Sequence, residues 1–465
     1  MSFERRMPPH RVAQASPVGR AAQAAVAAIS GLIGLGLCGS TQAQSLQDMY
    51  DAARVYDATF LGARAQAESA EYKAKQAYAL RLPTVGLSGG VSRNNADTPY
   101  TAPETTNTDT RSVTVSAQQN LFNRANDISI EQADRSVTVA QAALVAAEQD
   151  LIVRLAQAYF DVLGAEDNLG TVQASKKAIS EQLASAKRNF EVGTATITDT
   201  REAQARYDLA LAQELAADND LLVKRLALEQ LVGRNALKPS PLALPVQLPA
   251  LAPSAVDDWL AAAEQYNTSI IQTRLGLDVA KLETDKARAG HLPTVALAGS
   301  YSKSRLYVSG ESSGTGYSVS GNGSNAAIGV TVTVPLFAGF AIQNRVKETL
   351  ALEEKSRNDL DFARRSVAQC TRSAFFGVQS GRAQVLALEA AESSSKLALE
   401  ATQLGYKVGV RVNLDVLNAQ TQLFQTQRDL AKARYDVIVG GLRLRQSSGQ
   451  LKPEDIQSVN ALLVR

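Results

Sequence analysis

The sequence predicts a mixed fold in which long α-helices carry a few transmembrane β-strands, arranged as two structural repeats. Two runs of about 65 residues have helical character, which is far longer than a helix of an ordinary globular domain. Two other segments, 82–122 and 292–337, alternate apolar and small polar residues with the period of a β-strand. A similar turn sequence follows each long run, at 190–199 and at 405–418. This internal similarity indicates one structure built from two like halves.

Residues 1–43 have the features of a secretory signal peptide. A basic region precedes an apolar run over 21–37, and the small residues around Gln42 suit a cleavage site. The alternative of a transmembrane anchor is disfavoured because the run is short and rich in alanine and glycine. A lipoprotein site at Cys38 is disfavoured by the bulky Leu37 before it. The basic residues are Arg5, Arg6, Arg11 and Arg20.

The mature chain offers few residues for catalysis or metal binding. Without the leader it is nearly neutral and has no block of basic residues, so nucleic-acid binding is not expected. Its single cysteine, Cys370, excludes an intrachain disulfide, and its single histidine, His291, argues against a catalytic triad or zinc site. The glycine-rich stretch 31–36 lies in the leader and is not a nucleotide-binding loop. We therefore expect no enzyme activity, no cofactor and no metal.

The first structural repeat is assigned to residues 44–236. A helix is expected over 46–81, because apolar residues recur every three to four positions and Pro83 follows. Two strands of roughly ten residues come next, separated by a polar loop at 94–110. A continuous helix is expected over 125–189, and at 1.5 Å per residue it would extend roughly 100 Å. A further helix returns after the turn.

The second structural repeat, 254–449, has the same order of predicted elements. It follows a proline-rich connector, 237–253, which is expected to be extended because proline disfavours helix and central strand. The strands of this repeat lie in 292–337, with a Gly/Ser-rich loop expected at 302–325. The chain then ends in a polar C-terminal tail, 450–465.

Each turn between two long helices contains a Val-Gly pair. Gly193 and Gly409 follow the helix ends, where glycine adopts a left-handed conformation without steric cost, so both turns are expected to be tight. Nearby polar residues suit helix capping: Thr196 with Asp199 resembles a capping box, and Asn413 is a candidate cap of its own helix. The alternative is that the charged residues at the tips form a functional cluster.

Four predicted strands of apolar and small polar alternation fit a membrane β-barrel. Unpaired strand edges in lipid cost several kcal/mol per unsatisfied group, so a barrel must close. The smallest membrane barrels have about eight strands, so one chain cannot close alone. The strand number permits a dimer with eight strands or a trimer with twelve. A soluble coiled-coil protein with two incidental hairpins is the alternative.

The sequence resembles the TolC family of outer-membrane channels over about residues 45–463. The resemblance rests on FEVGTATITD at 190–199, on GYKVGVRVNLDVLNAQ at 405–420 and on LPTV before each pair of strands. It implies a homotrimer with a twelve-stranded outer-membrane β-barrel, continued by a long α-helical barrel through the periplasm. The connector and the C-terminal tail would form an equatorial band around the helices.

The resemblance also implies a function and partners. The channel would passively export proteins by type I secretion, small toxic compounds, or both, from an inner-membrane pump through a periplasmic adaptor to the outside. The pump would be an ABC or a proton-driven transporter, and outer-membrane lipid would surround the barrel. The alternative is a periplasmic adaptor or a coiled-coil structural protein of an export complex, although the sequence shows no lipoyl-like domain. The cargo is left open by the sequence.

The resemblance assigns roles to residues at the tips. Tyr406 and Arg411 match positions that hold the inner helix pair closed, and Thr198 and Asp199 match their partners in the periplasmic gate. Arg–carboxylate pairs suit such a latch because their hydrogen bonds are directional and charge-assisted.

The narrowest ring of the family has two aspartates per subunit. Asp415 matches the first, but Asn418 stands at the second. The pore constriction is therefore expected to carry half the usual charge and to prefer cations more weakly.

Overall fold

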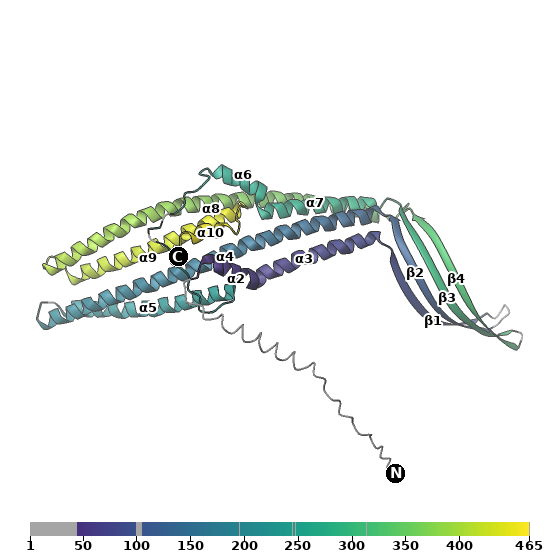
Figure 1. The fold of residues 1–465 in the computed structure, drawn as a ribbon, viewed down its shortest axis with the longest axis horizontal. Coiled ribbons are helices and arrows are strands. Elements are labelled where there is room, and N and C mark those ends of the chain that lie inside the picture. The colour runs from purple at the N-terminus through teal and green to yellow at the C-terminus, as the bar shows by residue number, and fades with distance from the viewer. Residues whose placement is uncertain are drawn as a thin grey trace, which may run out of the picture.

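The structure, a computed structural model, describes residues 44–98, 105–194, 196–243, 245–246, 248–312 and 314–464. Long helices lie side by side along the molecule, and a single β-sheet extends from one end of them (Figure 1). The expected signal peptide, residues 1–43, lies outside the described residues. The two tip turns lie together at the end farthest from the sheet (Figure 1).

The four strands form one antiparallel sheet in the order β1-β2-β3-β4. Strands β2 and β3 come from different halves of the chain and pair directly, with Val115 opposite Tyr301. Strands β1 and β4 are the edges of this sheet. The bounds are Thr84–Asp97 for β1, Thr105–Phe122 for β2, Thr294–Ser312 for β3 and Thr315–Thr333 for β4.

The strands are longer than the roughly ten residues expected. They contain 14, 18, 19 and 19 residues in chain order. Most of the loop expected at 94–110 is strand, and the loop expected at 302–325 reduces to a tight turn that includes Gly314 at φ 76°. Backbone pairing does not require apolar side chains, so serine, threonine, asparagine and glycine continue the ladder beyond its apolar part.

The helices follow the same order in both halves, and each helix of the first half has nearly the same length as its counterpart in the second. The two longest, α4 and α8, contain 68 and 67 residues. In the first half the bounds are Leu46–Tyr56 for α2, Ala58–Tyr78 for α3, Arg124–Glu191 for α4 and Ile197–Val232 for α5, with a 3₁₀ turn at Ala79–Arg81. In the second half they are Val256–Tyr266 for α6, Thr268–Ala289 for α7, Ala341–Lys407 for α8 and Asn413–Ser447 for α9.

The prediction of a single helix over 46–81 is wrong, because the helix is interrupted at Asp57. This residue has extended backbone angles (φ −60°, ψ 115°), and its carboxylate accepts a hydrogen bond of 2.7 Å from the Phe60 N–H at the start of α3. Arg154 of α4 donates to the same carboxylate at 3.1 and 3.3 Å. In the second half Asn267 makes the equivalent break and caps α7. In each half, a residue with a capping side chain therefore separates two consecutive helices.

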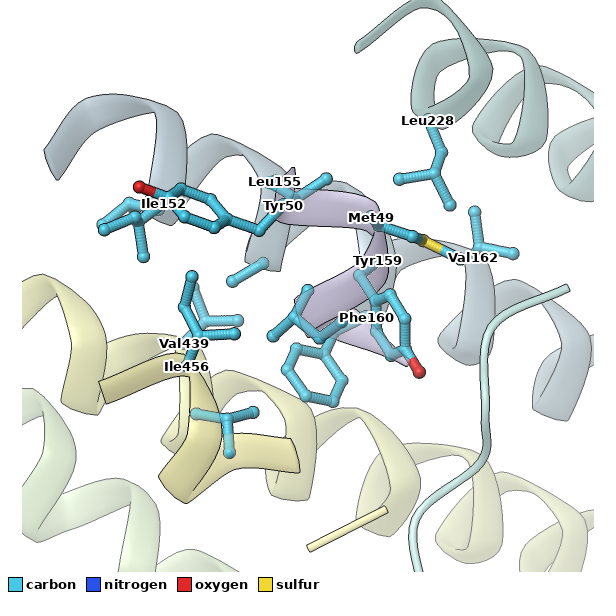
Figure 2. Packing of buried hydrophobic residues seen from close by; sticks show 14 of the residues in the cluster. Met49, Tyr50, Ile152, Leu155, Tyr159, Phe160, Val162, Leu228, Val439 and Ile456 are labelled. Carbon is cyan, nitrogen blue, oxygen red and sulfur yellow. The ribbon is translucent and has the colours of Figure 1, made fainter. Parts of the chain in front are cut away.

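The main apolar core lies about midway along the helices, where α2 inserts between α4, α5 and α9 (Figure 2). Met49 and Tyr50 of α2 pack against Leu155 and Tyr159 of α4, and all four are almost fully buried. By length and composition, one stretch of α4 is apolar enough to cross a membrane. Helix α4 supplies much of this core, but only 22% of the residues in that apolar stretch are buried within one chain.

The connector and the C-terminal tail meet beside this core. The Ala243 N–H donates to the Leu462 carbonyl at 2.9 Å, and the Val464 N–H donates to the Pro241 carbonyl at 2.8 Å. The tail is not simply polar, since it contains α10 (Asp455–Asn460), whose Ile456 is buried in the core. The two segments thus fasten onto the helices near their middle (Figure 1).

Candidate functional site

The two tip turns have the same backbone geometry. Gly193 and Gly409 have φ values of 79° and 77°, as expected for glycine after a helix. The Thr194 N–H donates to the Asn189 carbonyl at 2.7 Å, and the Val410 N–H donates to the Gly405 carbonyl at 2.9 Å. Each bond closes the end of a long helix, and the chain then reverses into the next helix. The prediction of tight turns at both positions is confirmed.

The caps of the two returning helices differ. Thr196 and Asp199 form the expected capping box: the Thr196 hydroxyl donates to the Asp199 carboxylate at 2.7 Å and accepts from the Asp199 N–H at 3.2 Å. The expectation that Asn413 caps α9 is wrong, because Val412 occupies the cap position and provides no side-chain hydrogen bond. Asn413 instead lies inside the first turn of α9. Its side chain is buried, and its Oδ1 has no hydrogen-bond partner among the described residues.

Tyr406 connects the two hairpins within one subunit. Its hydroxyl accepts a hydrogen bond of 3.2 Å from the Asn189 amide at the end of α4. Leu417 of α9 is also buried against α4 and α5, where it contacts Ile179 and Ala210. The two tips of a subunit therefore form one packed unit.

Arg411 makes a local contact only, in the part of the chain that the structure describes. Its guanidinium lies 3.6 Å from the Asp415 carboxylate, one helical turn away, and the two side chains are 61% and 36% exposed. Asp199 forms hydrogen bonds with Thr196 alone, and Thr198 is exposed. Thus the structure does not bring Arg411 or Tyr406 to Thr198 or Asp199 of the same chain.

Asn418 has a charged partner that sequence reasoning missed. Arg206 of α5 donates to the Asn418 side-chain oxygen at 2.9 Å and lies 3.5 Å from Glu202. The Arg206 side chain is 29% exposed, so it keeps contact with solvent. The sequence gives little indication of this contact, because Arg206 is one of many charged residues in α5.

The described residues contain no group of three or more His, Cys, Asp or Glu side chains that could hold a metal ion. A hollow of about 660 Å³ among them lies against the β-sheet rather than among the helices. Its lining includes the paired row Gly90, Ser112, Ser304 and Gly323. Such a hollow follows from the curvature of an open sheet and is not an enclosed ligand pocket.

The two faces of the sheet differ in chemistry. Directly paired residues share a face, and one face carries Val85, Leu87 and Ile328, which are 72–84% exposed. The other face carries glycine and serine, for example Ser116 paired with Ser300. In water so many exposed apolar side chains would be unfavourable, whereas a lipid-facing strand requires them.

The model of the outer membrane efflux protein family matches residues 49–234 and again residues 259–450. The chain belongs to this family. It is 33% identical to the outer membrane protein TolC of Vibrio cholerae, covering 91% of this chain and 95% of that protein. It is 31% identical to the alkaline protease secretion protein AprF of Pseudomonas aeruginosa, covering 91% and 88%.

Solved structures of outer-membrane channels share the fold. The outer membrane protein VceC from Vibrio cholerae superposes with a TM-score of 0.72 at 21% identity, covering 87% of this chain and 96% of that one. CusC superposes with a TM-score of 0.73 at 18% identity, covering 88% and 92%. As an outer membrane efflux protein, the chain is an export channel component, with its strands in the outer membrane and its helices in the periplasm.

Proposed function

We propose that three copies of this chain form one export channel, with a shared twelve-stranded barrel and a helical tunnel whose far end is closed at the tip turns. The observation that carries this proposal is the four-stranded sheet, whose edges β1 and β4 have no partner strand among the described residues. Unpaired edges in lipid are costly, so neighbouring copies must cover them. All four strands alternate in direction, so β4 of one copy can pair with β1 of the next in antiparallel fashion.

The helices also carry apolar side chains that are exposed in a single subunit. On α5 these recur at spacings of four and seven residues, which places them along one face. A neighbouring subunit would cover them in a closed ring of helices, as a coiled-coil seam does. The residues concerned, all 41–69% exposed, are Leu211, Leu215, Leu222 and Leu226 on α5 and Phe362, Leu386 and Leu397 on α8.

At the tip, the gate residues remain available for contacts between subunits. Arg411 is well exposed and only loosely paired with Asp415, and Thr198 is exposed. We infer that Arg411 and Tyr406 of one subunit face Thr198 and Asp199 of the next, and that three such sets hold the channel closed. Asp415 and Asn418 then lie at the constriction of the pore.

The channel has no energy source of its own in this proposal. A periplasmic adaptor would bind the helical tunnel, and an inner-membrane ABC or proton-driven transporter would deliver the cargo. Docking would move the inner helix pairs outward and release the tip contacts. Relatives of the chain are named both for protease secretion and for efflux, so either class of cargo fits the architecture.

The decisive experiment is to purify the full chain from outer membranes in detergent and to record native mass spectra and currents across planar bilayers. We expect a trimer that conducts ions in small, steady steps, because the tip contacts leave the channel nearly closed. A monodisperse monomer that never conducts would contradict the proposal.

A further inference from the structure

Three basic side chains cluster on the apolar face of the sheet. Arg111 of β2 lies directly opposite Arg305 of β3, and Lys303 lies two residues earlier on β3, opposite Val113. Paired residues and residues two apart on a strand share a face, so all three share the face of Leu87 and Tyr301. All three are exposed.

The cluster lies at the outer border of the apolar part of this face. Going from the helices outward along β3, the face carries Val295, Leu297 and Tyr301 before it reaches Lys303. At about 3.4 Å per residue, Lys303 is about 27 Å from Val295 along the strand, and with a strand tilt of about 40° this corresponds to a height of roughly 20 Å, within a lipid-facing apolar band of about 25 Å. Because the helices occupy the periplasm, this border belongs to the outer leaflet.

Among the described residues, the cluster forms no direct ion pair; the nearest carboxylate on this face, Asp109, feels the charge of Arg111 but is bound by Arg93. Arg93 and Asp109, on the same face, bind each other at 2.6 and 2.7 Å. Two like charges directly opposite each other on neighbouring strands are destabilising. An anion from outside the chain would therefore stabilise the pair Arg111 and Arg305.

A neighbouring subunit is poorly placed to supply that anion. Strands β2 and β3 are the inner strands of the sheet, and joining copies through β1 and β4 leaves their outward face uncovered. What meets this face at the border of the outer leaflet is lipid. Arginine binds phosphate oxygens through two parallel hydrogen bonds, and lysine adds a compact charge.

We propose that Arg111, Lys303 and Arg305 bind the phosphate groups of a phosphorylated lipid of the outer leaflet, one site in each subunit. The proposal rests on the proposed barrel, since the barrel is what turns this face toward lipid. Bound lipid would fix the height of the barrel in the membrane and relieve the repulsion between Arg111 and Arg305. Clusters of basic residues beside an apolar membrane surface recognise lipid headgroups in this way.

The test compares the parent with the variant R111Q/K303Q/R305Q, purified as the full chain in detergent. The probes are lipid A, lipid A with both phosphates removed, and inorganic phosphate, and native mass spectrometry counts the bound lipids. We expect the parent to bind lipid A and the variant to bind it at least about tenfold more weakly, with no displacement by inorganic phosphate. The control R93Q/D109N removes the neighbouring ion pair without changing net charge and should bind like the parent.

The single variants R111Q, K303Q and R305Q provide the measurement if the triple variant fails to assemble. Each should weaken lipid A binding by about fivefold. Equal binding by parent and variants, equal binding of the dephosphorylated lipid, or displacement by inorganic phosphate would overturn the lipid site. Each of these results leaves the trimer and its conductance intact, whereas a parent that is monomeric and does not conduct contradicts the proposed channel itself.

Discussion

At the tips of the helices, Tyr406 and Arg411 are held only lightly within their own subunit. Tyr406 accepts one hydrogen bond from Asn189, and Arg411 has one partly solvated contact with Asp415. Contacts of this kind are individually weak, about 1 kcal/mol each. A latch that depends on them must therefore gain strength from threefold repetition, and it stays easy for a docking partner to release.

The latch is tested by the variants R411S and Y406F. Each removes three contacts per channel, which shifts the balance between closed and open tips by up to about a hundredfold. We therefore expect larger single-channel conductance in planar bilayers for both variants. R365S, an exposed position on α8 away from the tip, is the control and should conduct like the parent. Unchanged conductance in both tip variants would remove Tyr406 and Arg411 from the gate.

Ion selectivity is the second prediction at this scale. Arg206 places a positive charge beside Asn418, one of the two residues proposed for the pore constriction. We expect R206A to increase the preference for cations and D415A to decrease it, while R206K resembles the parent. Reversal potentials across a salt gradient measure this preference. Equal reversal potentials for all four proteins would show that neither side chain lies at the constriction.

At the scale of secondary-structure elements, the break between α2 and α3 depends on Asp57. Burial by itself would raise the pKa of this carboxyl group, but the hydrogen bonds from Arg154 and from the Phe60 N–H outweigh it and lower the pKa. Its charged form therefore stabilises the folded chain. Asn267 caps the equivalent helix in the second half with a neutral amide, so this dependence on charge belongs to the first half alone.

We expect D57A to destabilise the protein by roughly 2–4 kcal/mol, because α3 loses its cap and Arg154 loses a partner. D57N retains a capping oxygen and should cost less. The stabilisation by the charged carboxylate is present above the ordinary pKa of aspartate, about 3.9, and is lost as the pH falls through the lowered pKa. Melting temperatures of parent and D57N should therefore converge in acid. A constant difference from neutral to acidic pH would contradict this role.

The sequence predicted which helices, strands and turns form better than it predicted where they begin and end. The long helices and both tip turns follow from periodicity and from Gly193 and Gly409, which act locally. The break at Asp57 was missed because neither proline nor glycine marks it, and its partner Arg154 is distant in the sequence. The polar residues in the outer parts of β3 and β4 predict a loop, but the backbone ladder continues through them.

The candidate site was predicted unevenly for the same reason. The capping box of Thr196 and Asp199 is local and was predicted correctly, whereas the contacts Tyr406–Asn189 and Arg206–Asn418 join different hairpins. Contacts between hairpins depend on how α4 and α5 pack against α8 and α9, which no local pattern encodes. The contacts between subunits proposed for Thr198 and Asp199 stay predictions.

At the scale of the whole molecule, the shared barrel fixes the number of subunits, and therefore the number of latches, in each channel. Mixing parent and R411S subunits before assembly tests this number directly. A trimer allows four compositions, from no variant subunit to three, so four classes of single-channel conductance are expected, with abundances set by the mixing ratio. A dimer, the alternative that eight strands permit, allows three classes. Because loss of each latch loosens a tip that the other subunits still restrain, conductance should rise stepwise with the number of variant subunits. Two classes alone, identical to the unmixed proteins, would mean that subunits do not share a channel.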